Sequence, residues 1–205
     1  MKLQEVAKNL TARGFETHIF ATGAEAAAWL CQQVKNKTVG IGGSMSIRQL
    51  GLHEELAKEN TVYWHWLPEQ AQQYGSVDAV RDLAARAEVY LTSANALSAQ
   101  GQIINIDGAG NRIASTAYGH KELYFLIGAN KIAENYEAAM FRARNVAAPL
   151  NARRLNRQTP CALSEEMKCY NCNSPDRICR ALTVFWAKPT ANPVEVILVR
   201  QELGY

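Results

Sequence analysis

The chain has 205 residues, of which 48% are hydrophobic and 20% are charged, and its formal net charge is +3 at pH 7. This composition supplies enough apolar side chains for one large folded domain and argues against intrinsic disorder. The longest apolar runs, residues 123–129 and 194–199, are too short to cross a bilayer, so we expect no membrane segment.

The first half of the chain alternates between helical and strand patterns. Helices are expected at residues 1–13, 23–34, 44–58 and 76–87, and strands at 15–22, 37–42, 61–67 and 89–92. Short connections between alternating strands and helices are typical of an α/β fold with a largely parallel sheet.

The pattern changes in the second half. Residues 102–107 and 112–116 flank a glycine-containing turn and predict a β-hairpin. A buried strand at 123–129, a long helix at 135–151 and a last strand at 194–201 follow. We find no internal repeat or linker, and therefore expect one domain over residues 1–205 with a cysteine-rich elaboration at 157–182.

Arginines cluster just before the cysteine-rich segment. They are Arg142, Arg144, Arg153, Arg154 and Arg157. Neither aromatic interleaving nor a nucleic-acid motif accompanies them, so an anion pocket or a solvated helix face is favoured over a nucleic-acid interface.

A glycine-rich loop follows the expected strand at 37–42. Gly42, Gly43 and Ser44 stand where this strand meets a helix, and Arg48 lies one turn further on. Glycines allow a ligand close to the backbone, and the free N–H groups of a first helical turn attract anions. The loop matches neither a Walker A motif nor a complete dinucleotide fingerprint, so a simple turn capped by serine remains the alternative.

Polar residues also follow two other expected strands. Ser93 and Asn95 come after the strand at 89–92, and Asn130 and Lys131 come after the strand at 123–129. In open α/β sheets, ligands bind beyond the carboxyl ends of the strands. We therefore expect these groups, together with Asn151 at the end of the long helix, to share one crevice with the glycine loop.

Four of the five cysteines fall within nineteen residues, with the spacing C-x7-C-x2-C-x6-C: Cys161, Cys169, Cys172 and Cys179. The N-terminal residues lack the apolar core and cleavage site of a secretory signal, so we expect a cytoplasmic protein whose thiols stay reduced. One C-x2-C pair with two single cysteines favours an iron–sulfur cluster, of the 4Fe-4S type, over structural zinc, which more often uses two pairs. Zinc and redox-labile thiols remain alternatives. Cys31 lies in an Ala-rich helix and reads as a core residue.

Five segments taken together resemble the lactate-utilisation (LUD) domain family, in its short stand-alone form with a cysteine cluster. They are TVGIGGSMSIRQLG, SANALSAQGQIINIDGAGNRIA, IGANKI, AAPLNARRLN and TPC…CYNCNSPDRIC. The resemblance implies a Rossmann-like three-layer fold, similar to the ribose-5-phosphate isomerase, glucosamine-6-phosphate deaminase and coenzyme A transferase group. It also implies a pocket lined by Gly42, Gly43, Ser44, Asn95, Gly108, Asn130, Lys131, Asn151 and Arg154.

Three functions remain open at this point. The first is an accessory or electron-transfer component of organic-acid (lactate-type) metabolism, which binds a small acidic or phosphorylated ligand and works with redox partner proteins. The second is a self-contained isomerase- or transferase-like enzyme with a structural zinc, in which Lys131, Asp107 or Glu122 acts as acid or base. The third is a ligand-binding sensor. Each is compatible with a homo-oligomer.

Overall fold

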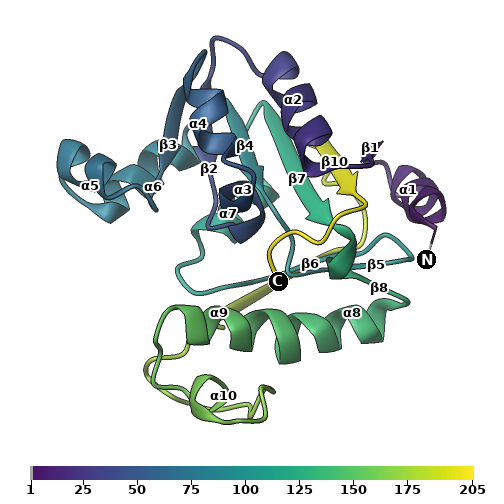
Figure 1. Cartoon of the computed structure of the whole chain (residues 1–205), viewed down its shortest axis with the longest axis vertical. Coiled ribbons are helices and arrows are strands. Elements are labelled where there is room, and N and C mark those ends of the chain that lie inside the picture. The colour runs from purple at the N-terminus through teal and green to yellow at the C-terminus, as the bar shows by residue number, and fades with distance from the viewer. Residues whose placement is uncertain (1) are drawn as a thin grey trace.

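The computed structural model describes residues 2–205 and contains a main sheet of six parallel strands. Their order across the sheet is β1-β10-β7-β4-β2-β3. The strands are β1 (Glu16–Phe20), β2 (Thr38–Ile41), β3 (Thr61–Trp64), β4 (Val89–Thr92), β7 (Glu122–Gly128) and β10 (Val194–Val199). The expected α/β class with a largely parallel sheet is confirmed (Figure 1).

Helices cover both faces of this sheet, because its central strands are apolar on both sides. On one face, α2 (Gly23–Gln33), α3 (Met45–Gln49) and α4 (Leu52–Ala57) pack against strand residues that include Tyr124 and Leu126. On the other face, α1 (Leu3–Ala12) and α6 (Val77–Ala85) pack against the alternate residues, among them Phe125 and Ile127.

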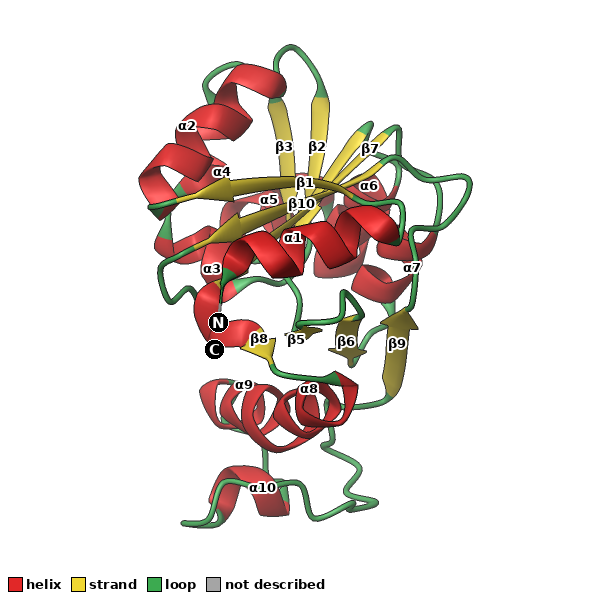
Figure 2. Cartoon of the chain, turned by 90° about the vertical axis from the view of Figure 1, so that its right-hand side faces the viewer, coloured by secondary structure: helices red, strands yellow, loops and turns green. Residues whose placement is uncertain are grey.

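A second, four-stranded sheet in the order β8-β5-β6-β9 lies beneath the second face (Figure 2). Its strands are β5 (Ala96–Ser98), β6 (Ile103–Asp107), β8 (Ile132–Ala133) and β9 (Ala181–Phe185). Leu97 and Ile103 point into the core shared with the main sheet, whereas Ala96 and Ile104 pack on the helix below. The small sheet therefore joins the α/β layers to the C-terminal helices.

The hairpin predicted at residues 102–116 is wrong. β6 instead pairs with β5 and β9, and residues Asn111–Ala117 form helix α7. The Asp107 carboxylate explains this, because it accepts hydrogen bonds from the backbone N–H groups of Arg112 (2.9 Å) and Ile113 (3.2 Å) and so caps the start of α7.

Two predicted helices are interrupted. Gly51, at a φ of 58°, separates α3 from α4, so residues 44–58 are not one helix. The long helix continues from α8 (Tyr136–Arg142) through a π-helical turn (Ala143–Ala147) into α9 (Ala148–Arg154). Pro149 has no N–H to donate to the preceding turn, which accounts for the wider turn before it.

The cysteine-rich segment follows α9. It contains α10 (Pro160–Leu163) and ends in β9, whose pairing with β6 aligns Ala181 with Asp107. Neither β9 nor α5 (Pro68–Tyr74) was expected from the sequence pattern. Across residues 2–205, no helix combines the length and the apolar character needed to span a membrane.

Candidate functional site

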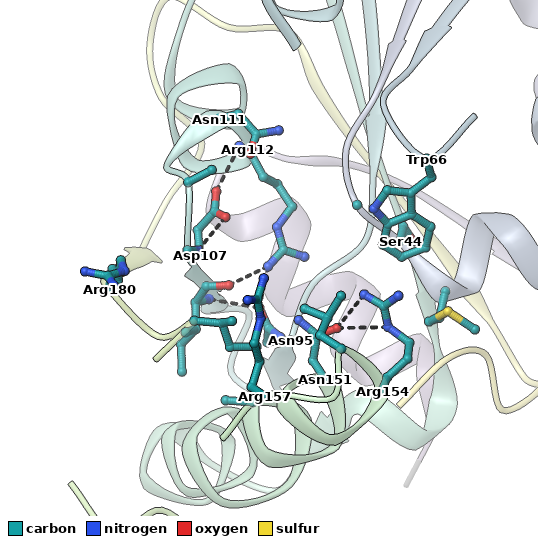
Figure 3. Close-up of a pocket in the computed structure, with 18 of the residues that line it drawn as sticks. Ser44, Trp66, Asn95, Asp107, Asn111, Arg112, Asn151, Arg154, Arg157 and Arg180 are labelled. Carbon is teal, nitrogen blue, oxygen red and sulfur yellow. Dashed lines mark hydrogen bonds between the residues drawn. The ribbon is translucent and has the colours of Figure 1, made fainter. Parts of the chain in front are cut away.

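A cavity of about 540 Å³ opens at the carboxyl ends of β2 and β4. After β2, the chain continues to β3, which lies beside β2 on one side of this pair. After β4, the next strand to join the main sheet is β7, which lies beside β4 on the other side. The two strand ends thus form a topological switch point, the usual ligand position in open α/β sheets. The cavity walls come from the glycine loop, residues 93–95, the end of β6, α9 and the cysteine-rich segment (Figure 3).

The glycine loop contributes Gly43 and Ser44 to the cavity wall. A Cβ atom on Gly43 would lie 3.2 Å from the Trp66 ring, so a side chain there would push against this wall. Ser44 caps α3, because its hydroxyl accepts a hydrogen bond from Ile47 N. Gly42 lies behind the wall, and Arg48 is exposed outside the cavity, since it stands near the far end of the short helix α3.

Lys131 closes the floor of the cavity and is 4% exposed. Its ammonium group donates to Ser46 Oγ (3.0 Å), Ser93 Oγ (3.0 Å) and Ala94 O (3.2 Å). Burial, with smaller contributions from the Arg142 and Arg112 charges, lowers the pKa of Lys131 to about 7. A substantial share of the protein therefore carries a neutral amine here at neutral pH.

Asn130 does not line the cavity. Its amide oxygen accepts from Leu203 N (3.0 Å) and its nitrogen donates to Gly204 O (3.3 Å). Asn130 thus fastens the segment that brings Tyr205 to the cavity wall.

Asn95 and Arg112 form a connected pair on the wall opposite Trp66 (Figure 3). The Asn95 amide oxygen accepts from Ile106 N and from Arg112 Nη2, both at 2.8 Å. Burial lowers the pKa of Arg112 from its ordinary value. Asp107 is occupied as the cap of α7, so its carboxylate is less free to act as an acid or base than its position in the sequence indicated.

Asn151 and Arg154 hold the opposite side of the cavity. The Arg154 guanidinium lies 4.5 Å above the Trp66 ring and donates to Asn151 Oδ1 and to Tyr205 Oη. Tyr205 in turn donates to Asn151 Oδ1 at 3.1 Å. Burial raises the pKa of Tyr205, so its hydroxyl stays protonated.

The cavity is strongly basic. The basic side chains in its wall are Arg81, Arg112, Lys131, Arg154, Arg157, Arg177 and Arg180. Both carboxylates in its wall already accept hydrogen bonds from the protein. Asp107 accepts from the first turn of α7, and Asp176 accepts from Arg157 Nη1 and Gln158 N. Within residues 2–205, the guanidinium groups of Arg112 and Arg154 have no carboxylate within ion-pair distance.

Glu122 lies elsewhere. It is the first residue of β7, at the amino end of the sheet, and forms an ion pair with Lys37 at 2.5 Å. Because the cavity lies at the carboxyl ends of the strands, the structure separates Glu122 from the other candidate residues. Gly108 does line the cavity, where a Cβ would approach Ile178 O to 2.9 Å.

Several cavity residues were not identified from the sequence. Trp66 and His65 follow β3, and Arg112 belongs to the segment expected to be a strand. Burial, reinforced by the Arg81 charge, lowers the pKa of His65 to about 4, so this imidazole is neutral at neutral pH. The basic run around residues 153–157 was the signal for an anion pocket, but nothing in it pointed to Arg112.

The four clustered cysteines line a second cavity of about 460 Å³. Hydrogen-bond donors lie beside two of the sulfurs: Arg144 Nη2 lies 3.6 Å and Asn171 N lies 3.4 Å from Cys169 Sγ, and Arg177 Nη2 lies 3.5 Å from Cys179 Sγ. Such N–H groups stabilise thiolates that ligate a metal. Cys31 lies apart, on α2.

The spacing of the sulfurs bears on which metal they fit. A zinc ion with Zn–S bonds of about 2.3 Å needs four sulfurs roughly 3.8 Å apart. In the described chain, no three cysteine sulfurs all lie within 4.8 Å of one another. In a four-iron cluster each cysteine binds a different iron, so its ligand sulfurs lie further apart than those of a single zinc ion.

Comparisons with known proteins agree with this fold. A family model described as the LUD domain matches residues 3–199. Among solved structures, the crystal structure of a DUF162 family protein from Deinococcus radiodurans is similar, with 13% identity and a TM-score of 0.52 over 96% of this chain and 95% of that one. At this identity the likeness shows the fold alone. No curated protein matches the chain.

Proposed function

The chain belongs to the LUD domain family, and from this premise we propose that it binds a small, multiply anionic organic acid beside a four-cysteine iron–sulfur centre, as a component of organic-acid oxidation. The observation that carries the proposal is the charge of the main cavity, whose wall holds six arginines and only two carboxylates, both of which already accept hydrogen bonds from the protein.

The excess of guanidinium groups indicates the ligand class. Arg81 and Arg157 already pair with Asp78 and Asp176. In the described chain the other four arginines have no carboxylate within ion-pair distance, and a monocarboxylate such as lactate, with one negative charge, would leave most of these four unpaired in a partly buried site. A phosphorylated acid brings several charges and the oxygen geometry that arginine forks recognise. Arg112 and Arg154, held by neutral partners on opposite sides of the cavity, are the groups we assign to the ligand.

The adjoining cysteine cavity supports the redox part of the proposal. The two cavities share Arg177, Ile178 and Arg180 in their walls. Cys161, Cys169, Cys172 and Cys179 would hold the cluster, and a cluster there supplies one-electron transfer next to the bound acid. Arg144 and Arg177 would offset its negative charge.

Calorimetric titration tests the ligand assignment. We expect phosphoglycerate to bind more tightly than inorganic phosphate, and lactate to bind most weakly. Arg154→Met should weaken phosphoglycerate binding by about tenfold or more. Arg86→Met, an exposed arginine outside the cavity, is the matched control and should bind like the parent. Equal affinity for lactate and phosphoglycerate would contradict the proposal.

Anaerobic purification followed by iron, sulfide and zinc analysis tests the metal centre. We expect a brown protein with iron and sulfide, and loss of both in Cys172→Ser. Cys31→Ser changes the one cysteine outside the cluster and should retain the metal. If the parent protein contains zinc and no sulfide, the iron–sulfur assignment is wrong and the cysteines form a zinc site.

A further inference from the structure

We propose that Ser93, Lys131 and Ser46 form an acyl-transfer site in which Ser93 is the nucleophile towards an ester or thioester of an anionic acid. The proposal rests on the proposed function in one respect, namely that the substrate enters the same basic cavity. Nothing in the redox part of that function requires a reactive serine.

The three side chains have the geometry of a nucleophile, its base and a group that orients the base. Lys131 Nζ lies 3.0 Å from both serine oxygens, and Ser46 Oγ lies 3.4 Å from Ser93 Oγ. Ser93 and Lys131 line the cavity, whereas Ser46 lies behind them. Unrelated serine enzymes use lysine as the base in this way.

Ser46 and Ala94 fix the position of the amine. Ser46 donates its own proton to Leu203 O at 3.0 Å, which leaves its oxygen to accept from Lys131. Ala94 O accepts a further hydrogen bond from Lys131. A neutral lysine can fill these two acceptors with its two protons and direct its lone pair at the Ser93 hydroxyl.

The surroundings of Lys131 favour the neutral amine. No carboxylate is among its contacts in the described chain, and the nearby charges are those of Arg142 and Arg112. A lysine that is desolvated and lies near other cations is activated as a base. The pKa of about 7 agrees with this environment.

Asn95 and Arg112 are placed to receive the developing negative charge. The Asn95 amide oxygen is occupied by Ile106 N and Arg112, which leaves its NH2 group for an oxygen of the substrate. The arginines of the cavity wall also favour an ester or thioester whose acyl group carries a further negative charge. A preorganised amide donor of this kind stabilises the oxyanion of an acyl-transfer intermediate.

The reaction balances without a redox step. Ser93 Oγ attacks the acyl carbon while Lys131 takes the hydroxyl proton. The tetrahedral oxyanion then collapses and expels the alcohol or thiol, which receives the proton from Lys131. Water attacks the resulting Ser93 ester, Lys131 takes its proton, and Ser93 leaves as the alcohol when that proton is returned.

Acylation by p-nitrophenyl acetate, with the adduct located by mass spectrometry of peptides, tests the site. We expect a burst of one p-nitrophenol per chain and an acetyl group on Ser93. Ser93→Ala should lower the burst rate by about 100-fold or more, and Ser93→Cys should restore acylation through its thiol. Ser46→Ala should slow it less, because Ser46 only positions Lys131. Ser98→Ala truncates a buried serine outside the cavity and should react like the parent.

Two results would overturn the proposal: an acetyl group located on another residue, or equal burst rates in the parent and Ser93→Ala. The pH profile adds a separate criterion, since the acylation rate should rise through about pH 7 in the parent but not in Lys131→Met. Phosphoglycerate binding by Ser93→Ala separates the two proposals. If that variant binds normally and the parent forms no Ser93 ester, acyl transfer is wrong and ligand binding stands.

Discussion

Burial makes Lys131 the most unusual titrating group of the site. Its ammonium ion finds only hydroxyl and carbonyl acceptors, so desolvation is not offset by a negative charge. The position of Lys131 after a buried strand could be predicted from the sequence, as could the positions of Ser93 and Asn95, because parallel strands bring their carboxyl ends to one edge. The contact of Lys131 with Ser46 could not be predicted, because Ser46 lies on a helix distant in the sequence and is itself held by Leu203 O of the C-terminal segment.

The pH dependence of stability follows from this burial. The folded pKa of Lys131, about 7, lies below the ordinary value of 10.5. Between these values the unfolded chain holds a proton that the folded chain has lost, so stability rises with pH by up to about 1.4 kcal/mol per unit. Below this window both states are protonated and the full cost of burying the ammonium remains.

Urea unfolding of the parent and of Lys131→Met, at about pH 7 and about pH 9, measures this term. The difference in unfolding free energy between the two proteins should move in favour of the parent at the higher pH. All other titrating groups are common to both proteins and cancel. A difference that stays constant would show that Lys131 keeps an ordinary pKa.

At the scale of single elements, β6 and its neighbours decide how the site is built. The sequence correctly marked residues 102–107 as a strand, observed as β6 at 103–107, but it could not show that β9, more than seventy positions later, would be the partner. The local sequence pattern also did not predict that Asp107 caps a helix. This cap stabilises the following residues as α7, which places Arg112 in the cavity wall. Pairing between distant segments depends on tertiary packing that no local window contains.

The contact between Gly108 and the cysteine-rich segment yields a prediction at this scale. A Cβ at Gly108 would lie 2.9 Å from Ile178 O, so Gly108→Ala must displace the backbone beside Cys179. We expect a loss of about 1–3 kcal/mol in stability, as for other overpacked positions, together with a lower metal content after anaerobic reconstitution. Ala109→Ser changes the exposed neighbour and should retain both properties. Unchanged metal content in Gly108→Ala would mean that this contact does not position the ligands.

At the scale of the whole molecule, the two cavities lie on either side of one shared wall. The cysteine-rich segment, residues 157–182, comes after most of the α/β layers in the sequence. In the structure it returns to pair with β6 through β9, and its residues form part of the wall of the basic cavity. Arg177 stands in this wall. Its guanidinium donates to Cys172 O (3.0 Å), to Cys179 O (2.9 Å) and to Cys179 Sγ (3.5 Å), and the same residue lines the ligand cavity.

Arg177 should therefore link ligand binding to metal binding. We expect Arg177→Gln to lower phosphoglycerate affinity by about tenfold, which is about 1.4 kcal/mol, because one cation of the cavity is lost. The same change should lower metal content, because the Cys172 and Cys179 backbone loses its anchor. Arg144→Gln provides the matched comparison: Arg144 contacts Cys169 Sγ and Asn171 but lines only the cysteine cavity, so this change should lower metal content and leave phosphoglycerate affinity unchanged.

Calorimetry on the metal-loaded and the metal-free protein completes the comparison. Reciprocity requires that, if metal loading changes phosphoglycerate affinity by some factor, phosphoglycerate changes metal affinity by the same factor. With Arg177 present we expect metal loading to change phosphoglycerate affinity, since both sites depend on the position of this one side chain, and in Arg177→Gln the change should shrink. If the parent and Arg177→Gln show the same change on loading, the shared wall separates the two sites without coupling them.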